Sequence, residues 1–147
     1  MVANRRFLKG EKMILKKGIK DLVSEANQVV QTISIDEAIA KVDDTDTLFV
    51  DVRDVRELER EGMIPGAFHA PRGMLEFWID PDSPYYKEVF GSGKNFYFYC
   101  ASAWRSALAT KTAQDMGLQN VAHIEGGFSN WKQVGGPVAE RSKVVSK

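Results

Sequence analysis

The segment from Asn95 to Met116 constrains the fold of this chain more than any other. Residues 95–99 form an aromatic run, Asn-Phe-Tyr-Phe-Tyr, that is typical of a β-strand. Residues 106–116 have the character of a helix, and only the six residues Cys100–Arg105 separate the two. The sequence therefore predicts a strand that passes through a tight loop directly into a helix.

Such a loop concentrates polar backbone groups at one point. Its backbone N–H groups converge there, and the positive end of the helix dipole adds to them, so the loop is suited to hold an anion. Cys100 is the first residue of the loop, and this setting favours its thiolate, the reactive form. Arg105 adds a permanent positive charge at the start of the helix. We interpret Cys100 as a nucleophile that needs no side-chain base; the alternative is a small buried hydrophobic residue.

The remaining segments alternate between strand-like and helix-like patterns. Residues 47–51 are a continuous apolar run ending in Asp51, as in a strand buried on both faces of a parallel sheet. The patterns predict further strands over 31–34 and 121–124, and a turn followed by a short strand within 63–70. They predict helices over 13–30, 34–42, 54–61 and 72–79, and a tight turn into a short helix within 126–131. This alternation predicts an α/β fold with a mainly parallel central sheet and helices on both faces. Ligand sites gather at the carboxyl ends of such strands, where Cys100 and Asp51 lie.

Composition excludes several classes of function. The chain has 147 residues, which suits a single domain, and its 20 Lys and Arg balance 20 Asp and Glu. The zero net charge argues against a nucleic-acid or anionic-membrane partner. A single cysteine excludes an internal disulfide and leaves a cysteine-based zinc site without ligands, so no metal is expected. A free thiol suits a reducing compartment, and no run is long enough to span a membrane, so we expect a cytoplasmic protein.

Four separated segments resemble the single-domain rhodanese family of sulfurtransferases. They are Asp51-Val52-Arg53 with Glu57, residues 62–67 (Gly-Met-Ile-Pro-Gly-Ala), the loop Cys100–Arg105 with Ser106, and residues 125–131 (Glu-Gly-Gly-Phe-Ser-Asn-Trp). The match runs in order from about Ile33 to Pro137. The resemblance implies a rhodanese-like domain over 31–138, preceded by a tail and amphipathic helix over 1–30 and followed by a polar tail over 139–147.

The resemblance also implies roles for individual residues. Cys100 would accept a sulfane sulfur as a persulfide, without a metal or organic cofactor, and pass it on. Asp51 and Arg53 would brace the loop and the neighbouring strand ends through hydrogen bonds. The donor would be a small sulfur compound such as thiosulfate, and the acceptor cyanide, a small thiol or a protein thiol. The outer sulfur would be cradled by the backbone N–H groups of Ala101, Ser102, Ala103, Trp104 and Arg105.

Two residues depart from the family pattern. Ala103 stands where a glycine is common, so the loop either differs in shape or holds Ala103 under strain. Glu57 stands near the position of a basic residue in the two-domain thiosulfate enzymes. We expect Glu57 to pair with Arg53 and to weaken recognition of small dianions.

Other functions remain open at this stage. Cysteine phosphatases and arsenate reductases use a similar loop with five residues between Cys and Arg, whereas this chain has four. A segment at 78–82 (Trp-Ile-Asp-Pro-Asp) resembles the general-acid loop of those phosphatases, and we interpret it as chance. A non-catalytic binding module on the same fold is a further alternative. His69 and His123 are interpreted as structural rather than as bases, while Trp104 either forms a lip of the site or packs behind the loop. The sequence does not fix the oligomeric state.

Overall fold

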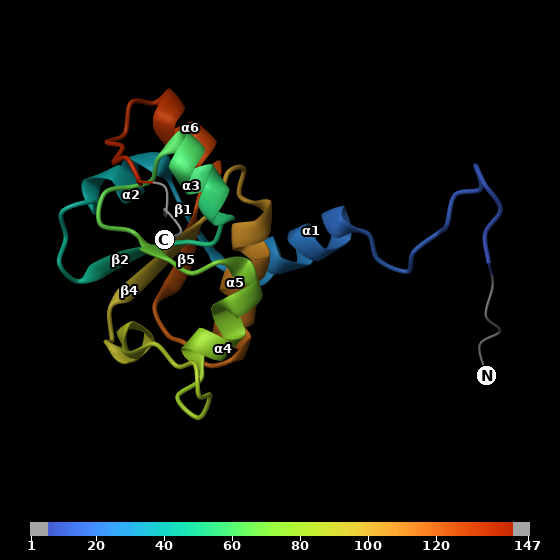
Figure 1. Cartoon of the computed structure of the whole chain (residues 1–147), viewed down its shortest axis with the longest axis horizontal. Coiled ribbons are helices and arrows are strands. Elements are labelled where there is room, and N and C mark those ends of the chain that lie inside the picture. The colour runs from blue at the N-terminus through green and yellow to red at the C-terminus, as the bar shows by residue number, and fades with distance from the viewer. Residues whose placement is uncertain (1–5, 143–147) are drawn as a thin grey trace, which may run out of the picture.

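A parallel sheet forms the centre of the molecule. The computed structural model describes residues 6–142, and within them the sheet has five strands in the order β1-β5-β4-β2-β3, all paired in parallel (Figure 1). The predicted parallel sheet is thus confirmed. The strands are β1 (Gln31–Ile33), β2 (Thr47–Asp51), β3 (Phe68–His69), β4 (Asn95–Tyr99) and β5 (Val121–Ile124).

Helices cover both faces of this sheet (Figure 1). On one face α4 and α5 pack against β2 and β4, and on the other face α2 and α6 pack against β1, β2, β4 and β5. The apolar cores on the two faces are separate clusters, as expected for strands that are apolar on both sides. The helices are α1 (Ile19–Val29), α2 (Ile35–Ala40), α3 (Val55–Glu61), α4 (Leu75–Ile79), α5 (Trp104–Asp115) and α6 (Gly127–Gln133), with short 3₁₀ turns η1 (Arg72–Met74) and η2 (Glu88–Gly91).

Strand β4 carries the residues that decide where the chemistry lies. Phe96, Phe98 and Cys100 belong to the core on the α5 side, whereas Tyr99 belongs to the core on the α6 side. This alternation is the ordinary consequence of the pleat of a strand. Register pairs Tyr99 with Asp51 on β2 and Phe98 with His123 on β5. The carboxyl ends of the central strands therefore meet beside the Cys100 loop, as predicted.

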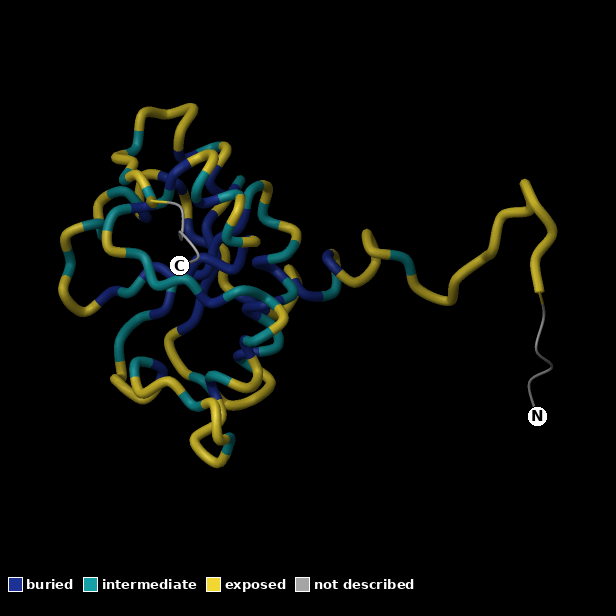
Figure 2. Tube along the Cα trace, in the orientation of Figure 1, coloured by how far each residue is buried: buried dark blue, intermediate teal, exposed yellow. Residues whose placement is uncertain are grey.

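The N-terminal helix is shorter than predicted. It begins at Ile19, with Gly18 as its N-cap, rather than at Met13. Val23 and Ala26 pack against Ala107 of α5, whereas Ile14 and Leu15 are exposed on a segment that runs away from the sheet (Figure 2). Periodic apolar residues form a helix only where they find a surface to cover, and residues 13–18 find none within the described chain. The parts of the two predicted tails that fall on residues 1–5 and 143–147 lie outside the described residues.

Helix α5 begins two residues earlier than predicted, at Trp104. Ala103 adopts a left-handed backbone conformation, with φ 71° and ψ 7°, and turns the chain at once into the helix. The strain expected of a non-glycine residue at this position is therefore present.

Candidate active site

Cys100 lies at the carboxyl end of β4, in the loop that leads into α5. It is 1% exposed, and its Sγ accepts a hydrogen bond from the backbone N–H of Ser106 at 3.3 Å. The N-cap residue of α5, Ala103, provides no side-chain hydrogen bond to the helix. The sulfur therefore occupies the place of a capping acceptor, where the free N–H groups and the helix dipole favour a negative charge.

The loop is held from outside through its carbonyl groups. The N–H of Phe128 donates to the Cys100 carbonyl at 2.8 Å, and the N–H of Ser129 donates to the Ala101 carbonyl at 3.0 Å. Gly127 makes this close approach possible: it has φ 65°, and a Cβ there would lie 2.7 Å from both carbonyl oxygens. The sequence indicated only a tight turn at Gly126-Gly127, and not that the turn clamps the loop.

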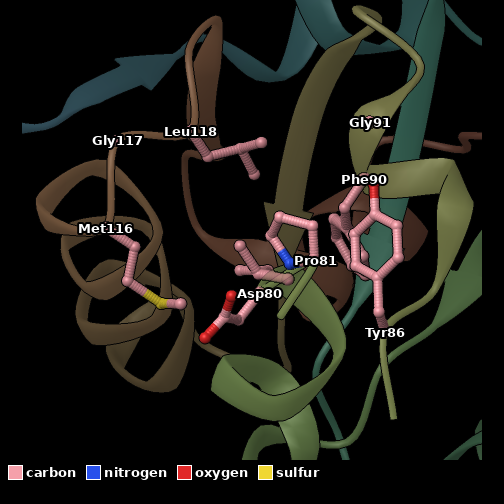
Figure 3. Close-up of a pocket in the computed structure, with 9 residues that line it drawn as sticks. Asp80, Pro81, Tyr86, Phe90, Gly91, Met116, Gly117 and Leu118 are labelled. Carbon is pink, nitrogen blue, oxygen red and sulfur yellow. The ribbon is translucent and has the colours of Figure 1, made fainter. Parts of the chain in front are cut away.

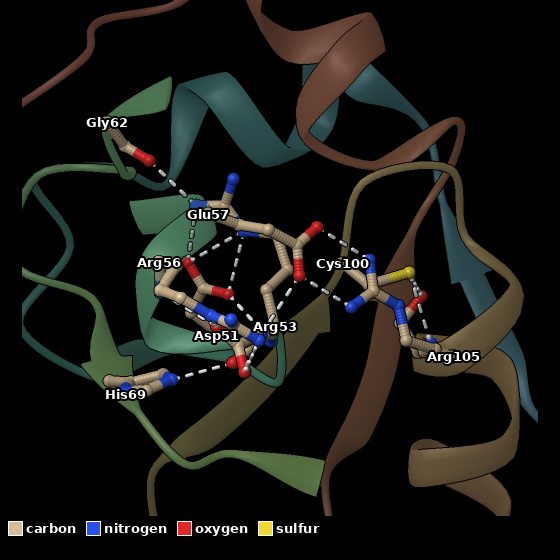
Figure 4. A network of polar contacts seen from close by, with 10 residues as sticks. Asp51, Arg53, Arg56, Glu57, Gly62, His69, Cys100 and Arg105 are labelled. Atoms are coloured by element: carbon tan, nitrogen blue, oxygen red, sulfur yellow. Dashed lines mark hydrogen bonds and ion pairs between the residues drawn. The ribbon is translucent and has the colours of Figure 1, made fainter. Parts of the chain in front are cut away.

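Arg105 is joined to α3 by a two-point ion pair. Its Nη1 and Nη2 donate to the two carboxylate oxygens of Glu57 at 2.8 and 2.9 Å (Figure 4). The prediction that Glu57 pairs with Arg53 is wrong. Arg53 donates its hydrogen bonds to Asp51 instead, and the Glu57 carboxylate faces the loop. The hydrogen bonds from Arg105 hold the pKa of Glu57 below its usual range. Glu57 also accepts from the N–H of Asp54 at 3.0 Å and so closes the predicted capping box.

Asp51 and Arg53 form a fully buried pair on the α6 side of the sheet. Arg53 donates from Nε and Nη2 to the carboxylate at distances of 2.7–3.2 Å, and Nη2 also donates to the Gly62 carbonyl at 2.7 Å (Figure 4). The guanidinium lies 4.4 Å from the ring centre of Phe128, the residue whose N–H holds Cys100. The prediction was that Asp51 and Arg53 brace the loop and the neighbouring strand ends through hydrogen bonds. In the structure their hydrogen bonds join β2 to the end of α3, and Phe128 lies between Arg53 and the loop.

A series of polar side chains within hydrogen-bond distance of one another lies behind Cys100. Its Sγ lies 3.6 Å from Ser106 Oγ, which lies 3.0 Å from His123 Nδ1. His123 Nε2 lies 2.9 Å from Asn27 Oδ1 of α1 and 3.1 Å from Thr32 Oγ1 of β1. Burial lowers the pKa of His123 to about 4. The sequence assigned no role to Ser106 or Asn27; the available signals were that Ser106 follows Arg105 directly and that His123 interrupts an apolar strand.

The loop borders a small pocket of about 250 Å³ at the surface. Cationic and acidic side chains alternate around it, so its rim carries both signs of charge. The lining residues are Arg53, Glu57, Arg60, Glu61, Ala101, Phe128, Ser129 and Lys132. Trp104 is not among them: its half-exposed side chain faces α1, beside Lys20, Ser24 and Asn27. Ser102 is exposed on the loop.

A separate pocket of about 450 Å³ lies at the other end of α5 (Figure 3). Asp80 and Pro81 line it together with Met116 and Gly117, which follow the last turn of α5. Because the 12 residues of α5 span about 18 Å, Asp80 lies far from Cys100. The segment at 78–82 is therefore not placed to act as a general acid for Cys100.

Comparison with known proteins defines the class to which this fold and site belong. The rhodanese-like domain model matches residues 34–134. A rhodanese domain-containing protein of Drosophila melanogaster is 30% identical over 93 residues, which are 60% of this chain and 84% of that protein. The chain belongs to the rhodanese-like domain family.

Other similarities point in several functional directions. A solved structure from Rhodopseudomonas palustris, described as a protein of unknown function and possible tyrosine phosphatase, is 54% identical with a TM-score of 0.85, covering 88% of this chain and all of that one. The polysulfide-sulfur transferase of Wolinella succinogenes is 27% identical with a TM-score of 0.62, covering 84% of this chain and 88% of that one. The tRNA uridine(34) hydroxylase of Pectobacterium carotovorum is 30% identical over 123 residues; the match covers 82% of this chain but only 33% of the hydroxylase.

Proposed function

We propose that this protein is a sulfurtransferase that carries a sulfane sulfur as a persulfide on Cys100. The observation that carries the proposal is the hydrogen bond from the Ser106 N–H to Cys100 Sγ at the start of α5, where no side chain caps the helix. A sulfur in this position is stabilised as an anion both before and after it takes up a second sulfur. The family and its sulfur-transferring relative in Wolinella succinogenes support the same chemistry.

The reaction has two steps. The Cys100 thiolate attacks the outer sulfur of a donor such as thiosulfate; a sulfur–sulfur bond forms, the donor's own sulfur–sulfur bond breaks, and sulfite leaves with the electron pair. An acceptor such as cyanide or a thiol then attacks the outer sulfur of the persulfide, and the Cys100 thiolate is the leaving group. We propose that the backbone N–H groups of Ala101–Arg105 cradle the outer sulfur, beside the Ser106 N–H that already donates to Cys100 Sγ. Both steps would then use electrostatic preorganisation, and the two-step exchange predicts ping-pong kinetics.

The rim of the site bears on the choice of partner. Arg105 and Lys132 would attract an anionic donor, but Glu57 and Glu61 neutralise them through ion pairs. We therefore propose that thiosulfate serves as an in vitro donor and that a donor or acceptor with less negative charge, including a protein thiol, is favoured. Because the charge of the chain is balanced, we propose that it has no nucleic-acid or membrane-surface partner. We also propose that the thiol works in a reducing, cytoplasmic setting. No helix of the described chain is long and apolar enough to cross a membrane.

Intact-protein mass spectrometry tests the proposal. Purified protein is incubated with thiosulfate and then with cyanide, beside Cys100→Ser. We expect a gain of one sulfur atom that cyanide removes and that the serine variant never shows. No gain with thiosulfate, mercaptopyruvate or a persulfide donor would refute the proposed function.

A phosphatase activity is the second candidate, because the 54% identical structure is described as a possible tyrosine phosphatase. Four residues separate Cys100 from Arg105, and the shorter ring suits one sulfur atom better than a phosphate group. The bidentate bond to Glu57 also occupies the Arg105 guanidinium that a phosphate would need. Hydrolysis of a phosphotyrosine peptide that depends on Cys100, without persulfide formation, would favour this candidate over sulfur transfer.

A further inference from the structure

The buried side chains behind Cys100 form a continuous path that the proposed mechanism leaves unused. It runs from Cys100 Sγ to Ser106 Oγ, to the His123 ring, and on to Asn27 of α1. We propose that this path is a proton relay, in which His123 takes up the Cys100 proton through Ser106 as the sulfur becomes a nucleophile. The inference rests on the proposed function in that Cys100 is the nucleophile.

The direction of the hydrogen bonds follows from Asn27. Its Oδ1 accepts a hydrogen bond, so His123 carries a proton on Nε2 and its Nδ1 is an acceptor. The Ser106 hydroxyl donates to that Nδ1, which leaves the hydroxyl oxygen free to accept from the Cys100 S–H at 3.6 Å. Between Cys100 and His123 both donors therefore point towards the ring, and the ring donates onwards from Nε2–H to Asn27.

Proton transfer reverses the direction of the two hydrogen bonds between Cys100 and His123, and no proton is gained or lost overall. The S–H bond breaks as Ser106 Oγ gains that proton, and the original hydroxyl proton of Ser106 moves to His123 Nδ1. The products are a thiolate, an unchanged serine and an imidazolium. Nδ1–H now donates to Ser106, and the Ser106 hydroxyl donates to the thiolate. When the acceptor removes the sulfur, the thiolate takes the proton back along the same path.

The surroundings of His123 suit a temporary proton acceptor. From α1, β1 and α5 the ring meets the uncharged groups of Asn27, Thr32 and Ser106, and its register partner on β4 is Phe98. Burial lowers the pKa of His123 to about 4, so the ring is neutral near neutral pH and its Nδ1 lone pair is available to the Ser106 hydroxyl. The charged residue of the loop, Arg105, is paired with Glu57 of α3. An imidazolium is thus costly here unless the thiolate forms beside it.

This relay gives α1 a part in the site. The family match begins at residue 34, and Asn27 lies before it. Helix α1 packs on α5 through Val23, Ala26 and Ala107, and this packing carries the Asn27 side chain to His123. His123 acts through Ser106, so it is a positioning residue rather than a catalytic one, and Asn27 fixes its tautomer.

The test is the rate at which iodoacetamide alkylates Cys100, followed by mass spectrometry between about pH 6 and pH 10. We expect His123→Gln and Ser106→Ala to react at least about 10-fold more slowly than the wild type near pH 7, since one unit of thiol pKa changes the thiolate fraction tenfold. Near pH 10 the rates should converge, because hydroxide then removes the proton without a relay. An unchanged rate, or a defect of equal size at every pH, would overturn the proposal.

A second variant predicts the opposite sign. Asn27→Asp places a carboxylate beside Nε2–H, which favours the imidazolium, so the rate near pH 7 should rise above that of the wild type. A purely structural role for Asn27 predicts no such gain, and its absence counts against the relay. If His123→Gln does not fold by circular dichroism, Asn27→Asp and Ser106→Ala decide the matter.

The matched control is Gln114→Ala, which removes a different α5–α1 hydrogen bond, from Gln114 Nε2 to the Val29 carbonyl at 2.9 Å. Its pH profile should follow the wild type. Alkylation requires no sulfur donor, so the relay and the proposed function fail separately. A normal relay profile without persulfide refutes only the sulfur transfer, and persulfide formation with no pH-dependent defect refutes only the relay.

Discussion

Arg105 and Glu57 connect the start of α5 to the first turn of α3 by hydrogen bonds of 2.8 and 2.9 Å. The same carboxylate closes the N-terminal cap of α3 through the N–H of Asp54. Glu57 is therefore at once a helix cap and the partner that fixes the arginine of the loop. One titratable group controls the position of two elements that border the site.

Removal of the Glu57 charge should change how stability depends on pH. The pKa of Glu57 is lowered in the folded protein, chiefly by hydrogen bonds from Arg105, so its contribution is present above the unfolded pKa and is lost as pH falls through the folded one. Glu57→Gln should therefore lower the melting temperature at neutral pH, by an amount that reflects about 1 kcal/mol, and the difference from the wild type should shrink below about pH 4. Thermal unfolding across pH measures this. Glu76→Gln, which breaks the surface pair with Arg72, serves as control and should change the melting temperature little.

Two arginines with the same spacing to an aspartate should differ sharply in their effect on stability. Arg53 pairs with Asp51 at 1% exposure, whereas Arg56 pairs with Asp54 at 81% exposure. Arg53→Met leaves an unpaired buried carboxylate and should lower the free energy of unfolding by about 3–5 kcal/mol. Arg56→Met should cost less than about 1 kcal/mol. Urea unfolding gives both values, and equal losses would contradict the assignment of burial.

Gly127 should be required for activity as well as for stability. A methyl group there meets the Cys100 and Ala101 carbonyl oxygens at 2.7 Å, so Gly127→Ala must displace the loop. We expect strong loss of persulfide formation, measured as above by mass spectrometry. Gly66→Ala is the matched control, since Gly66 also has positive φ but nothing within 4 Å of the added carbon. It should lose about 1 kcal/mol of stability and retain activity.

Ala103→Gly should stabilise the protein. The left-handed conformation costs an alanine about 1–2 kcal/mol, and the greater freedom of glycine in the unfolded chain offsets about 0.4–1 kcal/mol of that. A net gain of about 0.5–1 kcal/mol is expected in urea unfolding. Asn120→Gly, at the other non-glycine position with a left-handed backbone among residues 6–142, should gain less because asparagine tolerates this conformation. A loss of stability in Ala103→Gly would show that the alanine is not strained.

Local patterns predicted the elements of the fold well. The bounds of β2, β4 and β5 agree with the predicted ranges, because polar turns on either side of an apolar run mark where the strand begins and ends. The Asp54–Glu57 capping box could also be predicted, because its two partners lie only three residues apart in the sequence. The start of α1 was not, because residues 13–18 have a helical pattern but no surface to pack against.

Contacts between distant segments were beyond the sequence patterns. The bond between Glu57 and Arg105 joins residues 48 apart, and Asn27 and His123 are 96 apart. No local rule chooses between Arg53 and Arg105 as the partner of Glu57; burial of the Asp51–Arg53 pair decides it. Likewise, His123 could be identified as part of the site only once β5 was known to lie beside β4.

The alternation of Tyr99 and Cys100 along β4 divides the surroundings of the active loop into two electrostatic compartments. On the α6 side a buried ion pair between Asp51 and Arg53 lies against the ring of Phe128. On the α5 side, Ser106, His123 and Asn27 form the uncharged hydrogen-bonded path that we propose as a proton relay. The two sets lie on opposite faces of the sheet, so one face holds the shape of the loop while the other supplies the groups behind the sulfur. A chain built in this way can alter the groups behind the sulfur by substitution on the α5 side without rebuilding the scaffold that holds the loop.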